Sequence, residues 1–178
     1  MTFNDIALQR YSCRAYLPRP VEPEKLEAVL EAARIAPSAC NRQPWLFLVV
    51  DDPQARRWVI ESYDREWIKS APVFIIAFGL HEQAWSRPAD GKDHTDVDLS
   101  IAIEHICLAA VEQGLATCWV CNFDPEIIRN RFNAPDNCEP IAIIPLGYPA
   151  DGPVPEKKRK SLGEIVRVNS LDRPYDQK

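Results

Sequence analysis

Residues 23–53 read P-E-K-L-E-A-V-L-E-A-A-R-I-A-P-S-A-C-N-R-Q-P-W-L-F-L-V-V-D-D-P and contain a helix, a polar loop and a strand in immediate succession. Pro23 suits the first turn of a helix, and Pro37 ends that helix. The apolar side chains between the two prolines repeat at the spacing of one helix face, at Leu26, Val29, Leu30 and Ala33. The apolar run 45–50 then predicts a buried strand that ends at Asp51.

Outward from this stretch, helices and strands are mixed, and their connections differ greatly in length. Asp52 is placed to cap a second helix, which begins at Pro53 and turns Ala55, Trp58, Val59 and Tyr63 inward. Further strands are predicted at 73–80, 116–121 and 140–146, and further helices at 96–113, 125–132 and after the capping box Ser161-x-x-Glu164. Residues 81–95 predict a polar loop able to act as a lid. This order favours an α+β fold, or an α/β fold with irregular connections, over a regular βαβ array.

The composition predicts one globular domain, residues 1–178, with 46% hydrophobic and 26% charged residues. The net charge of −5 argues against a general nucleic-acid binder. No stretch approaches the roughly 20 apolar residues of a membrane-spanning helix, and the N-terminus has no apolar signal core. Six cysteines in a chain of this size fit reduced thiols better than disulfides. We therefore expect a cytoplasmic protein that acts on neither nucleic acid nor membrane.

Several common sites are absent from the sequence. Neither G-x-G-x-x-G nor G-x-x-x-x-G-K-S/T occurs, so the usual glycine-rich phosphate cradles are missing. There is no H-E-x-x-H, and His81, His94 and His105 are too few and too scattered for an evident metal site. We therefore expect no metal site.

The C-x-x-C at Cys118 and Cys121 is the obvious redox motif, but it lies inside an apolar run that predicts a strand. Redox dithiols of this spacing usually begin a helix, whose N-terminus stabilises the thiolate. A zinc site would need two more ligands, and Cys107 and Cys138 do not form a second C-x-x-C. A structural role is favoured, and a thiol or metal protein built on this pair stays open as an alternative.

Basic residues near both ends of the chain suit an anion. Arg10 and Arg14 flank Ser12, and the run 157–160 precedes the helix start at Ser161. Arginine and serine side chains, together with helix-start amides, bind phosphate dianions well. For each cluster by itself, solvated surface charge is the favoured interpretation, so the composition permits an anion pocket without requiring one.

The loop between the first predicted helix and strand carries amide side chains. Asn41 and Gln43 offer donors and acceptors that suit the uracil-like edge of a flavin or a nucleobase. Trp45 is better explained as core. From the residues alone, this is a plausible polar binding loop.

Four motifs in this order resemble the FMN-dependent nitroreductase family, and the resemblance spans nearly the whole chain. The first is R-Y-S-C-R-A-Y at 10–16, similar to R-x-S-x-R followed by an aromatic residue. The second and most specific is A-P-S-A-C-N-R-Q-P-W at 36–45, similar to A-P-S-x-x-N-x-Q-P-W. The third is G-L-A-T-C-W-V at 114–120, and the fourth is R-K-S-L-G-E-I at 159–165.

This resemblance implies an α+β homodimer with a mainly antiparallel sheet and FMN at the subunit interface. It implies a ping-pong reaction in which NAD(P)H reduces the flavin at N5 and an electron-poor small molecule, such as a nitroarene or a quinone, reoxidises it. No side chain is named as a catalytic acid or base. By matching positions, the expected cofactor-binding residues are Arg10, Ser12, Arg14, Pro37, Ser38, Ala39, Asn41, Gln43, Val120, Cys121, Arg159 and Lys160.

The sequence also departs from the family pattern. Cys121 stands where relatives often carry glycine, and the tail after Val168 is short, which leaves the acceptor range and the dimer contacts open. Alternatives are a flavin carrier or redox sensor without efficient NAD(P)H turnover, and another chemistry on the same fold, such as dehalogenation or flavin destruction. Fold resemblance does not decide the substrate.

Overall fold

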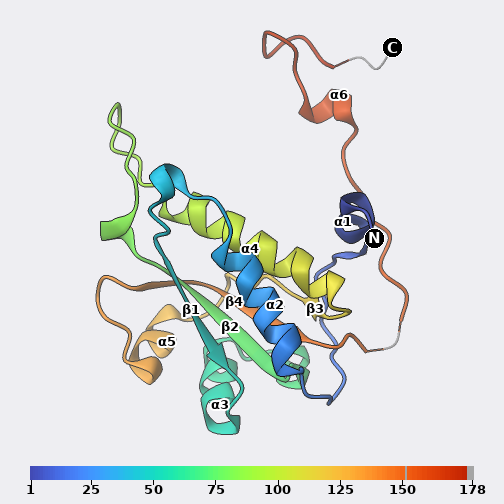
Figure 1. The fold of residues 1–178 in the computed structure, drawn as a ribbon, viewed down its shortest axis with the longest axis vertical. Helices are drawn as coiled ribbons and strands as arrows, with labels where there is room; N and C mark the ends of the chain where they lie inside the picture. The colour runs from blue at the N-terminus through green and yellow to red at the C-terminus, as the bar shows by residue number, and fades with distance from the viewer. Residues whose placement is uncertain (151, 176–178) are drawn as a thin grey trace.

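The predicted succession of helix, loop and strand is present in the computed structural model, which describes residues 1–150 and 152–175. Helix α2 (Pro23–Arg34) buries Val29 and Ala33, and a short 3-10 turn, η1 (Ala39–Asn41), occupies the loop. Strand β1 (Trp45–Val50) follows (Figure 1). The prediction that β1 is buried is wrong, because β1 lies at the edge of the sheet and leaves Leu46 53% exposed.

The sheet has four strands in the order β1-β2-β4-β3, and every pair is antiparallel. This confirms the α+β prediction. Strands β2 (Val73–Gly79) and β4 (Glu139–Gly147) form its centre, and every residue of β2 is buried, as its apolar run predicts.

Strand β3 (Ala116–Thr117) is shorter than the predicted 116–121. Its pairing with β4 resumes only at Val120, which exchanges hydrogen bonds with Ile143 at 3.0 and 2.9 Å. The same register sets Cys118 opposite Pro145, whose nitrogen carries no hydrogen for the ladder. The gap in the strand therefore follows from a proline on its neighbour.

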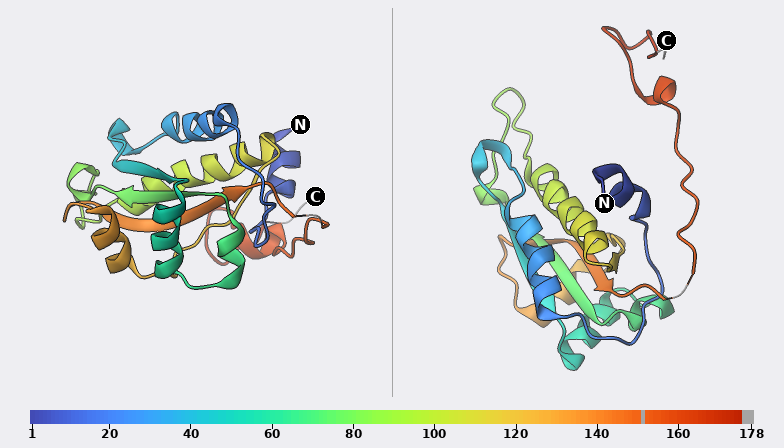
Figure 2. Two further views of the ribbon diagram at one scale, coloured as in Figure 1. Left: turned by 90° about the horizontal axis from the view of Figure 1, so that it is seen from below. Right: turned by 45° about the vertical axis from the view of Figure 1, so that its right-hand side comes forward.

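Helices cover both faces of the sheet. Helix α4 (Thr95–Glu112) packs with α2 over one face, and α3 (Pro53–Ser62) and α5 (Pro125–Phe132) pack over the other, as the left view of Figure 2 shows. Asp52 caps α3 as predicted, accepting two backbone N–H bonds at 2.9 Å. Within the described residues, no helix is both long enough and apolar enough to cross a membrane.

The two ends of the chain lie outside this layered body. Helix α1 (Phe3–Gln9), which the sequence reading missed, buries none of its residues. The described tail 152–175 leads away from the sheet and includes the short helix α6 (Leu162–Ile165), which begins at the predicted capping box (Figure 1, and the right view of Figure 2). Its apolar side chains are exposed, with Leu171 90% accessible.

Candidate functional site

The segment that carries Arg10, Ser12 and Arg14 runs beside β3. Ser12 forms a parallel bridge with Thr117, and the N–H of Cys13 donates to the Thr117 carbonyl at 2.9 Å. Cys13 is buried, while Ser12 and Arg14 remain exposed. The segment therefore presents its hydroxyl and its guanidinium to solvent next to the sheet.

Positive charge collects where the two ends of the chain meet. Lys157 donates a hydrogen bond to the carbonyl of Arg10, and its pKa is lowered by burial first and then by the charges of Arg10 and Arg159. Glu104 is the opposing carboxylate, and it lies 3.9 Å from the Arg10 Nε atom, beyond hydrogen-bond distance. Three cations share this one carboxylate, so the net charge left at the cluster is positive and suits an anion.

The family resemblance predicted that Arg159 and Lys160 supply the C-terminal contacts to the cofactor, and it did not single out Lys157. Arg159 is exposed and donates to the Lys158 carbonyl at 2.9 Å. Lys160 is exposed and makes no side-chain hydrogen bond or ion pair within the described part of the chain. Lys157 belongs to the same basic run, so its position in that run was the only signal that could have found it.

The C-x-x-C pair does not form a joint thiol site. Cys118 is buried and Cys121 is exposed, and both thiols are free. Burial is the main cause that raises the pKa of Cys118, while the charge of Arg14 and a hydrogen bond with Ser12 act against it. Cys118 is therefore a core residue under the basic segment, and Cys121 is a surface residue.

The loop 38–43 has an unusual backbone. Cys40, Asn41 and Gln43 all have positive φ, at 51°, 54° and 49°. The N–H of Gln43 donates to the Ser38 hydroxyl at 2.9 Å, and the Gln43 amide donates to Asn41 Oδ1 at 3.1 Å. Left-handed residues other than glycine are costly and concentrate at functional sites. The amide side chains of this loop are exposed.

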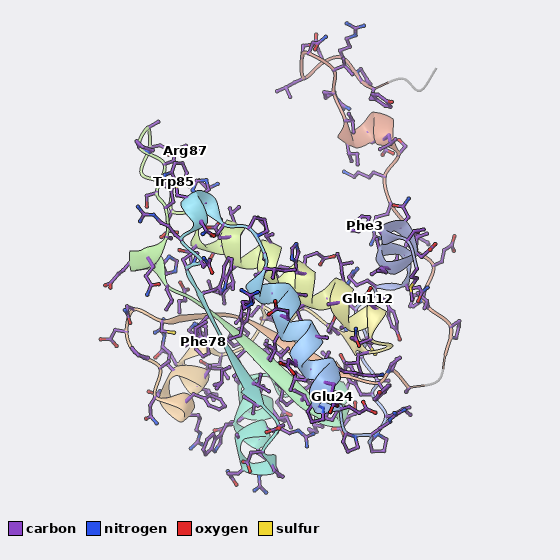
Figure 3. The ribbon with its side chains drawn as sticks, viewed as in Figure 1. Phe3, Glu24, Phe78, Trp85, Arg87 and Glu112 are labelled. Carbon is purple, nitrogen blue, oxygen red and sulfur yellow. The ribbon has the colours of Figure 1, made fainter. Side chains whose placement is uncertain are left out.

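Residues 81–95, the expected lid, project from the body in a hairpin-like turn. Figure 3 labels Trp85 and Arg87 on it. Its base is tied down at His81, whose Nδ1 lies 2.9 Å from Asp93 Oδ2 and whose Nε2 lies 2.5 Å from Glu139 Oε2. The pKa of His81 is raised, mainly by the hydrogen bond to Asp93. Closure over a ligand stays a prediction.

The predicted site residues fall into separate groups within one chain. Loop 38–43 contacts the start of α4 through Asp98, whereas Arg10 faces Glu104 farther along the same helix. Figures 1 and 2 show α1 and the turn η1 toward opposite ends of α4. Val120 is buried in the sheet, and Cys121 lines a pocket of about 250 Å³ with Phe123 and Glu139.

A larger groove lies between α2 and the exposed edge strand β1. It has a volume of about 890 Å³ and is lined by apolar side chains of both elements, namely Leu26, Leu30, Trp45, Leu46 and Phe47. Acidic residues of α2, including Glu24 and Glu31, border it, and Figure 3 labels Glu24 at the start of that helix. This groove was not predicted, because the apolar run of β1 indicated a strand buried in the core.

Comparisons with known proteins agree on one family. The model of the nitroreductase family matches residues 7–64 and 59–148. A solved nitroreductase family protein from Clostridium difficile 630 is 44% identical, with a TM-score of 0.90 over 96% of this chain and 100% of that chain. A Methanothermobacter thermautotrophicus protein named for NADH dehydrogenase and NAD(P)H nitroreductase is 34% identical over 81% of this chain and 75% of that protein. Iodotyrosine deiodinase 1 of Rattus norvegicus is 28% identical over 92% of this chain and 68% of that protein.

Proposed function

Because the chain belongs to the nitroreductase family and has its fold, we propose that it is an FMN-dependent oxidoreductase. It takes a hydride from NAD(P)H and passes it through the flavin to an electron-poor small molecule, such as a nitroarene or a quinone. The observation that carries the proposal is the net positive charge of Lys157, Arg10 and Arg159 beside the single carboxylate of Glu104, which suits the phosphate of FMN.

The described residues fit the rest of the cofactor as well. The exposed amides of Asn41 and Gln43 match the donor and acceptor pattern of the isoalloxazine edge. When bound, FMN supplies the hydride chemistry itself. The chain's own part is to hold the phosphate, orient the ring system and stabilise the negative charge that reduction adds. No side chain needs to act as an acid or a base.

The working form in this proposal is a homodimer. The cation cluster of Arg10, Lys157 and Arg159 meets α4 at Glu104, and the loop 38–43 meets it at Asp98. In this proposal, each FMN takes its phosphate contacts from one chain and its loop contacts from the partner. The tail adds a second argument, because Leu162, Ile165 and Leu171 expose apolar surface away from the body. A second copy would cover them.

Dehalogenation is a second candidate function. The alignment with rat iodotyrosine deiodinase 1 covers 92% of this chain. The same dimer and cofactor site would serve either reaction, so the choice lies in the acceptor pocket. An FMN carrier or redox sensor without efficient turnover is the alternative that makes no use of an acceptor.

The first test is the visible spectrum of the protein purified without added flavin, followed by NADH or NADPH without air. Yellow protein that bleaches supports the oxidoreductase, and adding a nitroarene, a quinone or an iodotyrosine then identifies the acceptor class that restores the colour. Yellow protein that resists bleaching favours the carrier. Colourless protein that takes up no added FMN contradicts the proposal.

A further inference from the structure

Asp98, on the first turns of α4, is a buried carboxylate that uses only one of its oxygens. The residue is 2% exposed. Its Oδ1 atom accepts a hydrogen bond from the N–H of Ala39 at 2.9 Å. Its Oδ2 atom is shielded from solvent and has no hydrogen-bond partner among the described residues. Burying a carboxylate with so few partners is unfavourable, so this side chain calls for a role beyond packing.

The bond to Ala39 restrains the loop whose backbone is strained. Ala39 begins the turn η1, and the next two residues, Cys40 and Asn41, both have positive φ. Inside the loop, the N–H of Arg42 donates to the Ala39 carbonyl at 3.2 Å, and Gln43 bonds back to Ser38. Strained backbone of this kind persists only where its surroundings hold it. Asp98 holds the loop from outside, by accepting the N–H of Ala39, the first residue of the turn η1.

The start of α4 is a firm base for this restraint. Thr95 is fully buried and packs against the end of β2, where a Cβ atom on Gly79 would lie 2.6 Å from Thr95 Cγ2. Asp93 accepts the Thr95 N–H at 2.6 Å and fixes the first turn of the helix. The start of α4 is therefore fixed relative to β2, and Asp98 in turn fixes the loop 38–43 relative to α4.

We propose that Asp98 is a positioning residue for the flavin: it sets the backbone of loop 38–43 so that Ala39 and Asn41 meet the isoalloxazine ring at the right distance. This inference rests on the proposed function, because the ligand it positions is FMN. The residue acts through Ala39 and does not touch the cofactor. What it requires is an acceptor at Oδ1 for the Ala39 N–H.

The test compares FMN binding to the full chain and three variants by fluorescence titration. Asp98→Leu keeps the number and branching of the side-chain heavy atoms but removes the acceptor, and Asp98→Asn keeps both the shape and an acceptor. Thr95→Val is the matched control, because it changes a buried side chain one turn away and keeps the Cγ2 methyl that packs against β2. Losing one hydrogen bond to a charged group should raise the Kd of Asp98→Leu by about tenfold, with Asp98→Asn within about threefold of wild type and Thr95→Val unchanged. At saturating FMN, the visible circular dichroism of the flavin should change only in Asp98→Leu.

Asp98→Leu binding FMN as wild type does, with an unchanged flavin spectrum, would overturn the inference. Asp98→Asn weakening as much as Asp98→Leu would also overturn it, because charge and not the acceptor would then matter. If Asp98→Leu does not fold, hydrogen exchange of the Ala39 amide in the wild-type holoenzyme decides: slow exchange supports the restraint, and fast exchange refutes it. Wild-type protein that binds no FMN overturns the proposed function and this inference together. Unchanged FMN binding in Asp98→Leu, by contrast, overturns only this inference.

Discussion

The ammonium group of Lys157 donates a hydrogen bond to the backbone carbonyl of Arg10, which lies 147 positions earlier in the chain. This one contact joins the C-terminal basic run to the N-terminal R-Y-S-C-R segment. The first and last of the four sequence motifs therefore lie close together in space, which their order along the chain did not show. The cluster so formed has three cations beside the one carboxylate of Glu104, so its net charge is positive and suits an anion.

Replacing Lys157 with methionine should weaken FMN binding by about tenfold, the effect of losing one charged phosphate contact. Lys158→Met removes the same charge from an exposed neighbour and should leave the affinity near that of wild type. Riboflavin lacks the phosphate and should bind both variants equally. Isothermal titration with both flavins measures this, and an equal loss of riboflavin affinity in Lys157→Met would assign the residue a purely structural role.

The tie between loop 81–95 and the sheet should depend on pH through His81. Hydrogen bonds to Asp93 and Glu139 raise its pKa above the usual 6.5. The stabilisation from these two hydrogen bonds is therefore fully present below pH 6.5, where the imidazole is charged in both folded and unfolded chains. It is lost as the pH rises through the raised pKa of His81 in the folded chain. We expect trypsin to cut after Lys92, an exposed residue of this loop, faster in His81→Gln than in wild type at pH 6, and at equal rates at pH 9. Glu82→Gln is the control, and a pH-independent ratio would rule out His81 as the titrating group.

Cys121→Gly should change the preference among acceptors while FMN stays bound. The thiol lines the pocket with Phe123 and Glu139, so its removal widens that space and leaves the cation cluster untouched. The measurement is the ratio of kcat/KM for a bulky and a small quinone, with Cys40→Ser as a control at the other exposed thiol. Loss of FMN from Cys121→Gly would contradict this prediction and mean that the Cys121 side chain, and not only the backbone of this segment, is needed to hold the cofactor.

Charges placed on the tail should separate the proposed dimer. Leu162→Glu together with Ile165→Glu puts two carboxylates where apolar side chains are exposed in one chain and would be covered by a second. Sedimentation velocity should show monomers, and FMN should be lost with the partner. Glu156→Gln, on the same tail, should remain dimeric. A double variant that stays dimeric would place the interface elsewhere.

Much of the fold was predictable because its signals are local. The boundaries of α2, α3 and α5 follow from prolines and caps, and the fully apolar run of β2 predicted the central strand. Helix α1 was missed because its residues repeat no buried face, although Thr2 and Asp5 form a capping box. The end of β3 could not be foreseen, because the proline that interrupts it lies on β4.

The candidate site was less predictable, because it depends on which residues meet in space. The motifs named Arg10 and Ala39, but not the separation between them along α4. Composition cannot tell which lysine of a basic run is half-buried, so Lys157 went unnoticed. Asp98 read as one more polar residue at a helix start, and only its burial and its bond to Ala39 give it a role.

The strand order has a consequence for how the chain folds. Strand β2 lies between β1 and β4, and β4 ends only at Gly147. During synthesis, the fully apolar β2 therefore has β1 as its only sheet partner until more than four-fifths of the 178 residues have been made. Closing the sheet across such a long separation is slow, since chain entropy is lost before the pairing rewards it. The nascent chain thus carries an open apolar strand edge from the completion of β2 at Gly79 until β4 is made, which is the stage at which a chaperone would protect it from aggregation.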